Sequence, residues 1–275
     1  DDFTVDPAKI RAAITPRTKA ILPVDIGGWP ADYDAIHAVL DAPDVRALFV
    51  ASTPRQEKLG RILVVSDAAH SIGATYKGRR AGALGRLACF SFYPGKNLGA
   101  YGEGGALVTR DAELANLARQ FRDHGQKTRY VHERLGFNYR MDGFQGAVLG
   151  VKLKYLDRWN AARRRVAAEY DRKLASAGVI TPPPCPDGEH VYHIYALRCE
   201  KRDELKANLQ ECGIGTNLHY PTPIHLQKPF EPFGYRAGSM PVSEEIGATE
   251  LSLPMYAELT AEQIERVIAA VHAAV

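Results

Sequence analysis

The sequence lacks several features that would assign it to a particular class of protein. Its 275 residues carry a formal net charge of only +3, which is too small to indicate a nucleic-acid-binding protein. Its densest basic cluster, residues 163–165, lies in a helical pattern and is typical of a solvated helix face. No apolar run approaches the roughly 20 residues that span a bilayer. We therefore expect neither nucleic acid nor a membrane among the partners.

Cysteine is scarce and scattered, which argues against a disulfide framework and a zinc site. The four cysteines form no C-x-x-C pair; they are Cys89, Cys185, Cys199 and Cys212. The segment HVYH, residues 190–193, does not suggest a metal pair, because strand residues three apart point to opposite faces. Scattered thiols without a signal peptide are typical of the reducing cytoplasm. We expect a soluble cytoplasmic protein without a metal centre.

What the sequence does contain, with 45% hydrophobic and 24% charged residues, is the pattern of an α/β protein. Near-continuous apolar runs suit strands that are covered on both faces. Helical patterns that begin near a proline alternate with the first runs, at residues 6–14 and 30–40. This alternation indicates a mainly parallel sheet flanked by helices. The predicted strands are residues 19–24, 46–50, 61–67, 88–92 and 105–109.

The pattern changes in the second half of the chain. Residues 147–177 predict one long helix that ends at Gly178, and a proline-rich break follows it. Beyond the break we expect a strand over 190–199, a helix over 202–212 and a last helix that opens with a capping box at Thr260. The predicted domains are a large α/β domain, a connecting helix and a small α+β domain, over residues 1–150, 151–178 and 179–275.

Reactive side chains follow two of the predicted strands. Asp67 and His70 follow one strand, and Ser91 and Lys96 follow the next. Ligands of open α/β sheets bind beyond the carboxyl ends of strands, so these four side chains could converge. A lysine of lowered pKa can form a Schiff base, and a carboxylate can hold a cationic ring nitrogen; both are contacts that pyridoxal phosphate requires. A plain surface role for the lysine is the alternative.

Six segments now make a family recognisable: DAAHSIGATYKG, FSFYPGKNLGAYGEGGALVT, RDHGQ, GFNYRMDGFQGAVLGVKL, HYPTPIHLQ and LSLPMY. In this order they resemble the DegT/StrS family of nucleotide-sugar aminotransferases. The resemblance covers the whole chain. It implies the aspartate aminotransferase fold, which is fold type I of the enzymes that depend on pyridoxal 5′-phosphate (PLP), and a PLP or pyridoxamine cofactor.

The resemblance also implies a role for individual residues. Lys96 matches the lysine that binds the cofactor as a Schiff base and moves the reacting proton. Asp67 matches the acid beneath the pyridine nitrogen, and His70 stands near the phenolic oxygen, where many members have glutamine. Ser91 matches a phosphate ligand. Asn138 matches an asparagine that reaches the phosphate from the neighbouring subunit, which implies a homodimer with shared active sites.

Three further residues fall in the segment that lies near the sugar-nucleotide site in the family, namely His219, Tyr220 and His225. For these residues a substrate-binding role and a plain loop role stay open. The loop PGKNLGAYGEGG favours a dTDP-linked 3-keto-6-deoxy sugar as amino acceptor, with glutamate as donor. Amination of a 4-keto sugar is the alternative.

Two other functions compete with amino transfer. Related dehydratases remove a sugar hydroxyl, but they carry histidine at the position of Lys96. A truncated or regulatory, non-catalytic homologue is the second alternative, which the retained Lys96 and Asp67 disfavour. It stays open because family members carry a further N-terminal segment, so we expect the N-terminal part of the large domain to be missing here. The segment PVDIGG, where the family has PVHLYG, and an enlarged connection over residues 42–61 are further departures.

Overall fold

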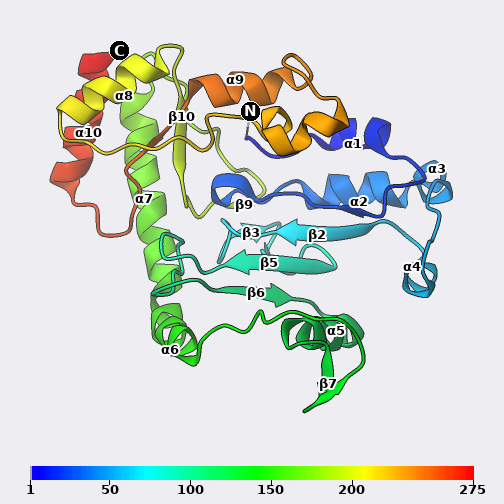
Figure 1. Cartoon of the computed structure of the whole chain (residues 1–275). Helices are drawn as coiled ribbons and strands as arrows, with labels where there is room; N and C mark the ends of the chain where they lie inside the picture. The colour runs from blue at the N-terminus through cyan, green and yellow to red at the C-terminus, as the bar shows by residue number, and fades with distance from the viewer. Residues whose placement is uncertain (1) are drawn as a thin grey trace. The chain divides into compact units, whose positions relative to one another are not determined.

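The described part of the chain divides into two compact units, each with its own hydrophobic core. The computed structural model describes residues 2–275. We call Thr4–Asp157 together with Asp187–His190 the sheet unit. Residues 2–3, Arg158–Pro186 and Val191–Val275 form the C-terminal unit. Figure 1 follows the elements of both along the chain. The domain boundaries predicted at residues 150 and 178 stay a prediction.

The sheet unit contains a four-stranded sheet in the order β1-β2-β5-β6. Its first three strands run parallel, and β6 is antiparallel to β5. This arrangement confirms the predicted α/β architecture with a mainly parallel sheet. The strand bounds are Ala20–Ile21 for β1, Leu63–Asp67 for β2, Leu87–Ser91 for β5 and Gly105–Val108 for β6.

The strand predicted over residues 46–50 is wrong. Helix α3, Pro43–Ala47, occupies the start of this segment, and no strand is assigned among residues 48–50. Pro43 stands at the first turn of α3, where its fixed φ favours a helix. An apolar run of five residues does not by itself distinguish strand from helix. The proline and the buried Val45 therefore decide the conformation.

Aspartate side chains start the predicted helices of the sheet unit. Asp6 accepts a backbone hydrogen bond at the start of α1, Pro7–Ala13, and Asp32 does so for α2, Tyr33–Asp41. Both helices bury apolar side chains in one core together with β2. Further elements of this unit are α4 (Pro54–Leu59), α5 (Ala112–Arg122), η1 (Ile26–Gly28), β3 (Thr75–Tyr76), β4 (Arg79–Arg80), β7 (Gln126–Thr128), β8 (Val131–His132) and β9 (Gly188–Glu189).

The single long helix predicted over residues 147–177 is interrupted. Helix α6, Gly143–Lys152, ends in a 3₁₀ turn, η2 (Leu153–Tyr155), and α7 (Leu156–Leu174) follows. In one straight helix Leu149, Leu153 and Leu156 would share a face. The tighter turn breaks this stripe: Leu149 and Leu156 are buried, whereas Leu153 is 56% exposed.

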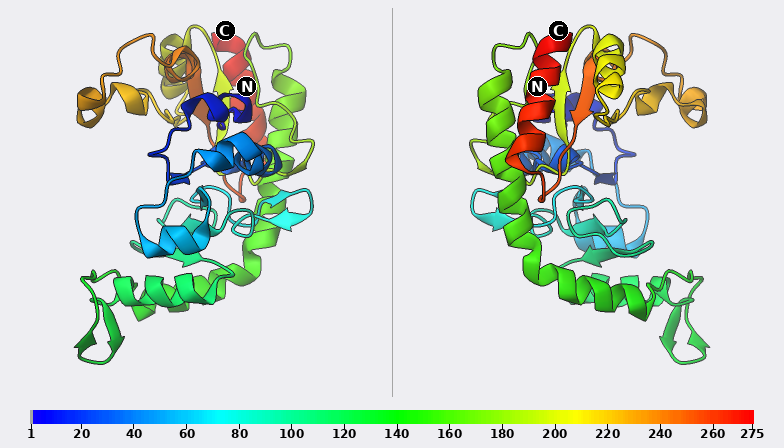
Figure 2. Two further views of the ribbon diagram at one scale, coloured as in Figure 1. Left: turned by 90° about the vertical axis from the view of Figure 1, so that its right-hand side faces the viewer. Right: turned by 90° about the vertical axis from the view of Figure 1, so that its left-hand side faces the viewer.

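The C-terminal unit packs helices against an antiparallel strand pair. β10 (Tyr195–Arg198) pairs with β11 (Glu250–Leu253). The core is formed by these strands with α7, α8 (Arg202–Glu211) and α10 (Ala261–Ala274), and the last two confirm the predicted helices. The predicted capping box at Thr260 is present. Figure 2 shows α7 and α10 from two sides. The other elements are α9 (Pro241–Thr249), η3 (Ile224–Leu226) and η4 (Lys228–Phe233).

The described residues also bear on the predicted membrane and metal properties. Among residues 2–275, no helix combines the length and the apolar character that crossing a membrane requires. None of the four cysteines takes part in a disulfide. Over the same residues, no group of three or more His, Cys, Asp and Glu side chains is arranged to hold a metal ion. The cytoplasmic location stays a prediction.

Candidate active site

Lys96 lies in a tight loop directly after β5. Its backbone N–H donates to the carbonyl oxygen of Tyr93 over 2.9 Å. Gly99 is required in this loop, because a Cβ at that position would clash with the backbone carbonyl of Pro94. The loop therefore closes on itself and holds the backbone that carries the lysine.

The Lys96 amine is half-buried, and this changes its chemistry. Burial lowers the pKa of Lys96 below its usual range, while the negative charge of Asp67 opposes the shift. An amine with a lowered pKa is uncharged more often at neutral pH, which makes it a better nucleophile. Asp67 ends β2, the strand that pairs with β5, so its carboxylate and the amine can serve one site.

Asp67 is the last residue of β2, and both of its backbone polar groups are bonded. Its N–H donates to the carbonyl of Pro23, and its carbonyl accepts from Asp25 N–H, each over 2.9 Å. Its Oδ1 accepts the N–H of Ala69 over 3.0 Å. In the parallel register Asp67 lies opposite Cys89 of β5. The strand ends that carry Asp67 and Lys96 are thus neighbours, as the sequence predicts.

Ser91 closes β5 on the same edge. Its Oγ accepts the N–H of Tyr93 over 3.2 Å. A hydroxyl group that accepts one hydrogen bond can still donate its own hydrogen to another acceptor. Ser91 is therefore suited to bind an anionic oxygen close to the start of the Lys96 loop.

His70 is buried, and its tautomer follows from its partner. The N–H of Gly27 lies 3.1 Å from Nδ1 of His70. A backbone N–H can only donate, so Nδ1 is the acceptor and carries no hydrogen. The neutral ring then carries its hydrogen on Nε2. His70 is therefore held as a hydrogen-bond donor at Nε2. Its partner Gly27 has a left-handed backbone conformation, which favours glycine at that position.

Sequence reasoning missed one acidic residue of this site, Asp25. It is fully buried and accepts hydrogen bonds from Ser71 Oγ (2.6 Å), Tyr33 Oη (2.9 Å) and Ala31 N–H (3.1 Å). Burial raises the pKa of Asp25 to about 6, and the charge of nearby Asp67 adds to the shift. The sequence feature that could have identified Asp25 is an acidic residue beside an apolar run, in the segment PVDIGG that departs from the family pattern.

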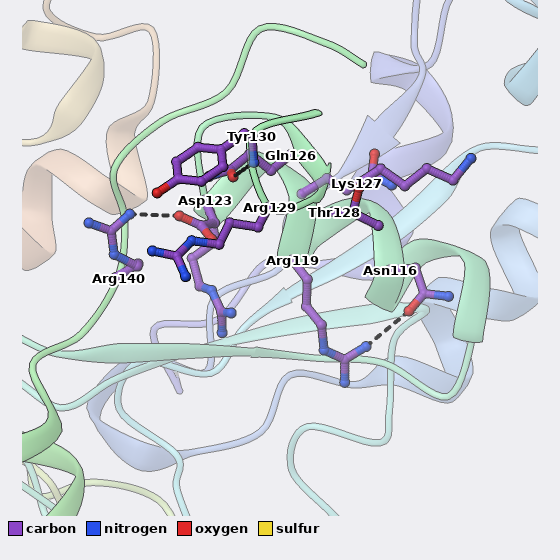
Figure 3. Close-up of a pocket in the computed structure, with 11 residues that line it drawn as sticks. Asn116, Arg119, Asp123, Gln126, Lys127, Thr128, Arg129, Tyr130 and Arg140 are labelled. Carbon is purple, nitrogen blue, oxygen red and sulfur yellow. Dashed lines mark hydrogen bonds and ion pairs between the residues drawn. The ribbon is translucent and has the colours of Figure 1, made fainter. Parts of the chain in front are cut away.

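Asn138 lies in a different part of the sheet unit. It is exposed, and its backbone pairs with that of Asp123. Asp123 lines a concave pocket of about 950 Å³, and Asp123 also pairs with Arg140 over 2.6 Å (Figure 3). The residues that line this pocket do not include the four candidate cofactor-binding residues at the ends of β2 and β5, which are Asp67, His70, Ser91 and Lys96. Its cationic lining residues are Arg119, Arg122, Lys127, Arg129 and Arg140.

The other three predicted residues belong to the C-terminal unit. His219 donates its backbone N–H to Glu250 over 2.7 Å, and Tyr220 beside it is 55% exposed. His225 Nε2 lies 2.9 Å from Oε1 of Glu244, and its side chain is largely buried. Glu244 also accepts backbone hydrogen bonds from residues 238 and 240. His225 therefore anchors its own loop.

Comparison with known proteins gives these residues a context. The pattern of the DegT/DnrJ/EryC1/StrS aminotransferase family matches residues 1–52 and 56–272. The chain is 45% identical to a pleiotropic regulatory protein of Geobacillus stearothermophilus, over 97% of this chain and 68% of that protein. It is 43% identical to the dTDP-3-amino-3,4,6-trideoxy-alpha-D-glucose transaminase of Streptomyces venezuelae, over 98% of this chain and 67% of that enzyme.

A solved structure extends the likeness to three dimensions. The PLP form of the sugar aminotransferase Spr1654 from Streptococcus pneumoniae matches with a TM-score of 0.92 and 26% identity, over all of this chain and 72% of that one. This match confirms the predicted fold of PLP-dependent aminotransferases, and the family match confirms the resemblance found in the sequence. The chain belongs to the DegT/DnrJ/EryC1/StrS aminotransferase family.

Proposed function

We propose that this chain is a PLP-dependent sugar aminotransferase that moves an amino group from glutamate to a nucleotide-linked keto-hexose. Membership of the family supports the class of reaction. The observation that carries the proposal is the position of the half-buried Lys96. It follows β5, and Asp67 ends the neighbouring parallel strand β2, so that the carboxylate influences the pKa of the amine.

The residues of the sheet unit fit the cofactor. An amine of lowered pKa, a carboxylate, a hydrogen-bond donor at His70 Nε2 and a serine hydroxyl are the groups that PLP requires around it. When bound, PLP supplies an electron sink. Asp67 would keep a pyridine nitrogen protonated, His70 would donate to the phenolic oxygen, and Ser91 would donate to the phosphate.

Lys96 would have two tasks in the reaction. Its uncharged amine would bind the cofactor covalently and, once released by the incoming amino group, would accept the proton from Cα of the donor amino acid. The same amine would then deliver a proton to the cofactor carbon that is bonded to the transferred nitrogen. Burial helps both tasks, because a lysine of lowered pKa exchanges protons more readily near neutral pH.

Asn138 supports a homodimer with shared active sites. We propose that it reaches the cofactor phosphate of a second copy of this chain. The residue is exposed, and large apolar side chains beside it in the sequence are exposed too: Leu135 (94%), Tyr139 (71%) and Phe144 (66%). Side chains of this kind stabilise a chain best when a partner covers them.

The sugar is proposed from the loop after Lys96. The segment PGKNLGAYGEGG favours a dTDP-linked 3-keto-6-deoxy sugar, and the name of the Streptomyces venezuelae relative denotes a 3-amino sugar. We propose that His219 and Tyr220 contribute to binding this substrate. His225 would act through its contact with Glu244 rather than through the substrate.

Covalent labelling tests the proposal directly. The chain is incubated with PLP, reduced with borohydride and mapped by peptide mass spectrometry, and we expect the label on Lys96. The matched control is Lys77, a surface lysine that pairs with Asp34, which should stay unlabelled. A label on Lys77, or on no lysine after cofactor absorbance has appeared, would refute the role of Lys96.

A further inference from the structure

The C-terminal unit contains a buried carboxylate that the proposed chemistry does not use. Glu250, the first residue of β11, is only 1% exposed. Burial raises its pKa, while hydrogen bonds from Ser252 and from the His219 N–H, together with the charge of Arg202, oppose the shift. Burying a charged group costs free energy unless it is well paired, and Glu250 is held by all three partners.

The hydrogen bonds of Glu250 form a chain with a defined direction. An ionised carboxylate can only accept, so Ser252 uses its single hydroxyl hydrogen on Oε1 of Glu250. The Oγ of Ser252 must then act as the acceptor toward Nδ1 of His219, which lies 2.8 Å away. Nδ1 therefore carries a hydrogen. In the neutral ring, Nε2 of His219 is the nitrogen with the lone pair.

Backbone hydrogen bonds hold the three residues of this hydrogen-bond chain in place. Asn217 and Ser252 exchange two backbone hydrogen bonds, of 3.2 and 2.9 Å. Two residues further on, the N–H of His219 donates to Oε2 of Glu250 over 2.7 Å. One carboxylate thus holds both the backbone of His219 and, through Ser252, its ring. His219 has the opposite tautomer to His70, whose Nδ1 accepts a hydrogen bond from Gly27.

We propose that Glu250 and Ser252 are positioning residues that hold His219 with its hydrogen on Nδ1, so that Nε2 accepts a hydrogen bond from a hydroxyl group of the sugar substrate. The substrate part of this proposal rests on the proposed aminotransferase function. A purely structural role would also require Glu250 to be buried and bonded. The same hydrogen bonds would fix this tautomer of His219 in a purely structural role, so the rate of the reaction with the sugar distinguishes the two roles.

The substitution Glu250→Gln provides a sharp test because it should reverse the direction of the hydrogen bonds that link residue 250, Ser252 and His219. The backbone N–H of His219 requires an acceptor, so the amide oxygen of Gln takes the place of Oε2. The amide nitrogen then faces Ser252 and donates to its Oγ, and Ser252 turns its hydrogen toward His219 Nδ1. His219 should change from the Nδ1–H to the Nε2–H tautomer while the size of the side chain is kept.

The tautomer is measured by nitrogen-15 NMR of the full chain, at about pH 8, above the ordinary histidine pKa of about 6.5. A His219→Gln variant identifies the signals of this ring. We expect an unprotonated Nε2 in the wild type and an unprotonated Nδ1 in Glu250→Gln. The control is Glu245→Gln, an exposed glutamate that pairs with Arg198 and should leave the tautomer unchanged.

Activity is measured on the PLP-loaded enzyme as two separate half-reactions. With Glu250→Gln, amination of the keto-sugar should slow about tenfold, the size of one lost hydrogen bond, while the reaction with glutamate keeps its wild-type rate. Equal rates for the sugar in variant and wild type would overturn the substrate role of His219. A wild-type Nε2–H tautomer would overturn the positioning role, even if Glu250→Gln failed to fold.

Failure of the proposed function has a different signature. A wild-type chain with the Nδ1–H tautomer that aminates no keto-sugar would refute the aminotransferase proposal and the substrate hydroxyl with it, while the hydrogen-bond chain would stand. An active wild-type enzyme whose His219 has the Nε2–H tautomer would refute only the role of Glu250 and Ser252.

Discussion

Replacing Asp25 with Asn should remove a loss of stability that the sheet unit suffers as the pH rises. Asp25 is fully buried, and its pKa in the folded chain is about 6 instead of 3.8. The folded state therefore binds the proton more tightly than the unfolded state does. The resulting stabilisation is complete below pH 3.8 and is lost as the pH rises through about 6.

The magnitude follows from the two pKa values. Their difference, 6 minus 3.8, is about 2.2, and at about 1.36 kcal/mol per pKa unit this corresponds to about 3 kcal/mol. Asn stays neutral throughout this range. Its amide also fits the site, since the oxygen can accept from Ala31 and Tyr33 while the nitrogen donates to Ser71. The stability difference between variant and wild type should thus change by up to about 3 kcal/mol between pH 3.8 and neutral pH.

Denaturant unfolding at several pH values measures this difference. The chain has two tryptophans, and in a Trp159→Phe background the fluorescence of Trp29, four residues from Asp25, reports on the sheet unit alone. The control is Asp44→Asn. Arg11 lowers the pKa of this exposed acid, so its contribution is present at neutral pH and lost in acid. Parallel stability profiles for Asp25→Asn and wild type would refute the reasoning.

Three further predictions concern activity. Asp67→Asn should lower turnover by about a hundredfold or more, because a neutral amide cannot hold the ring proton, yet the chain should stay folded by circular dichroism; near wild-type turnover would contradict this role. Inactive Lys96→Ala and Asn138→Ala subunits should regain activity when co-assembled, since one shared site is then intact, and a confirmed but inactive heterodimer would count against sharing. Among dTDP- and UDP-linked keto-sugars, a 3-keto substrate should react fastest; a faster 4-keto sugar would overturn the proposed acceptor.

Local patterns predicted much of the framework because their causes are local. Thr260 forms the predicted capping box, and helices α1 and α2 form within the predicted residues 6–14 and, apart from Asp41, 30–40, because capping depends on residues within one turn. The apolar runs before Asp67 and Lys96 form strands as expected. The same reasoning failed where a short apolar run has no preferred period, as in residues 46–50.

The sequence by itself determined which chemical groups this protein carries and in what order: a lysine loop after one strand, an acid after its neighbour, and the motifs of one aminotransferase family. Only the tertiary structure decided how those groups behave. The burial of Asp25, the lowered pKa of Lys96 and the opposite tautomers of His70 and His219 depend on partners far away in the chain. Desolvation and hydrogen-bond direction arise from packing between distant segments, which spacing along a sequence does not specify.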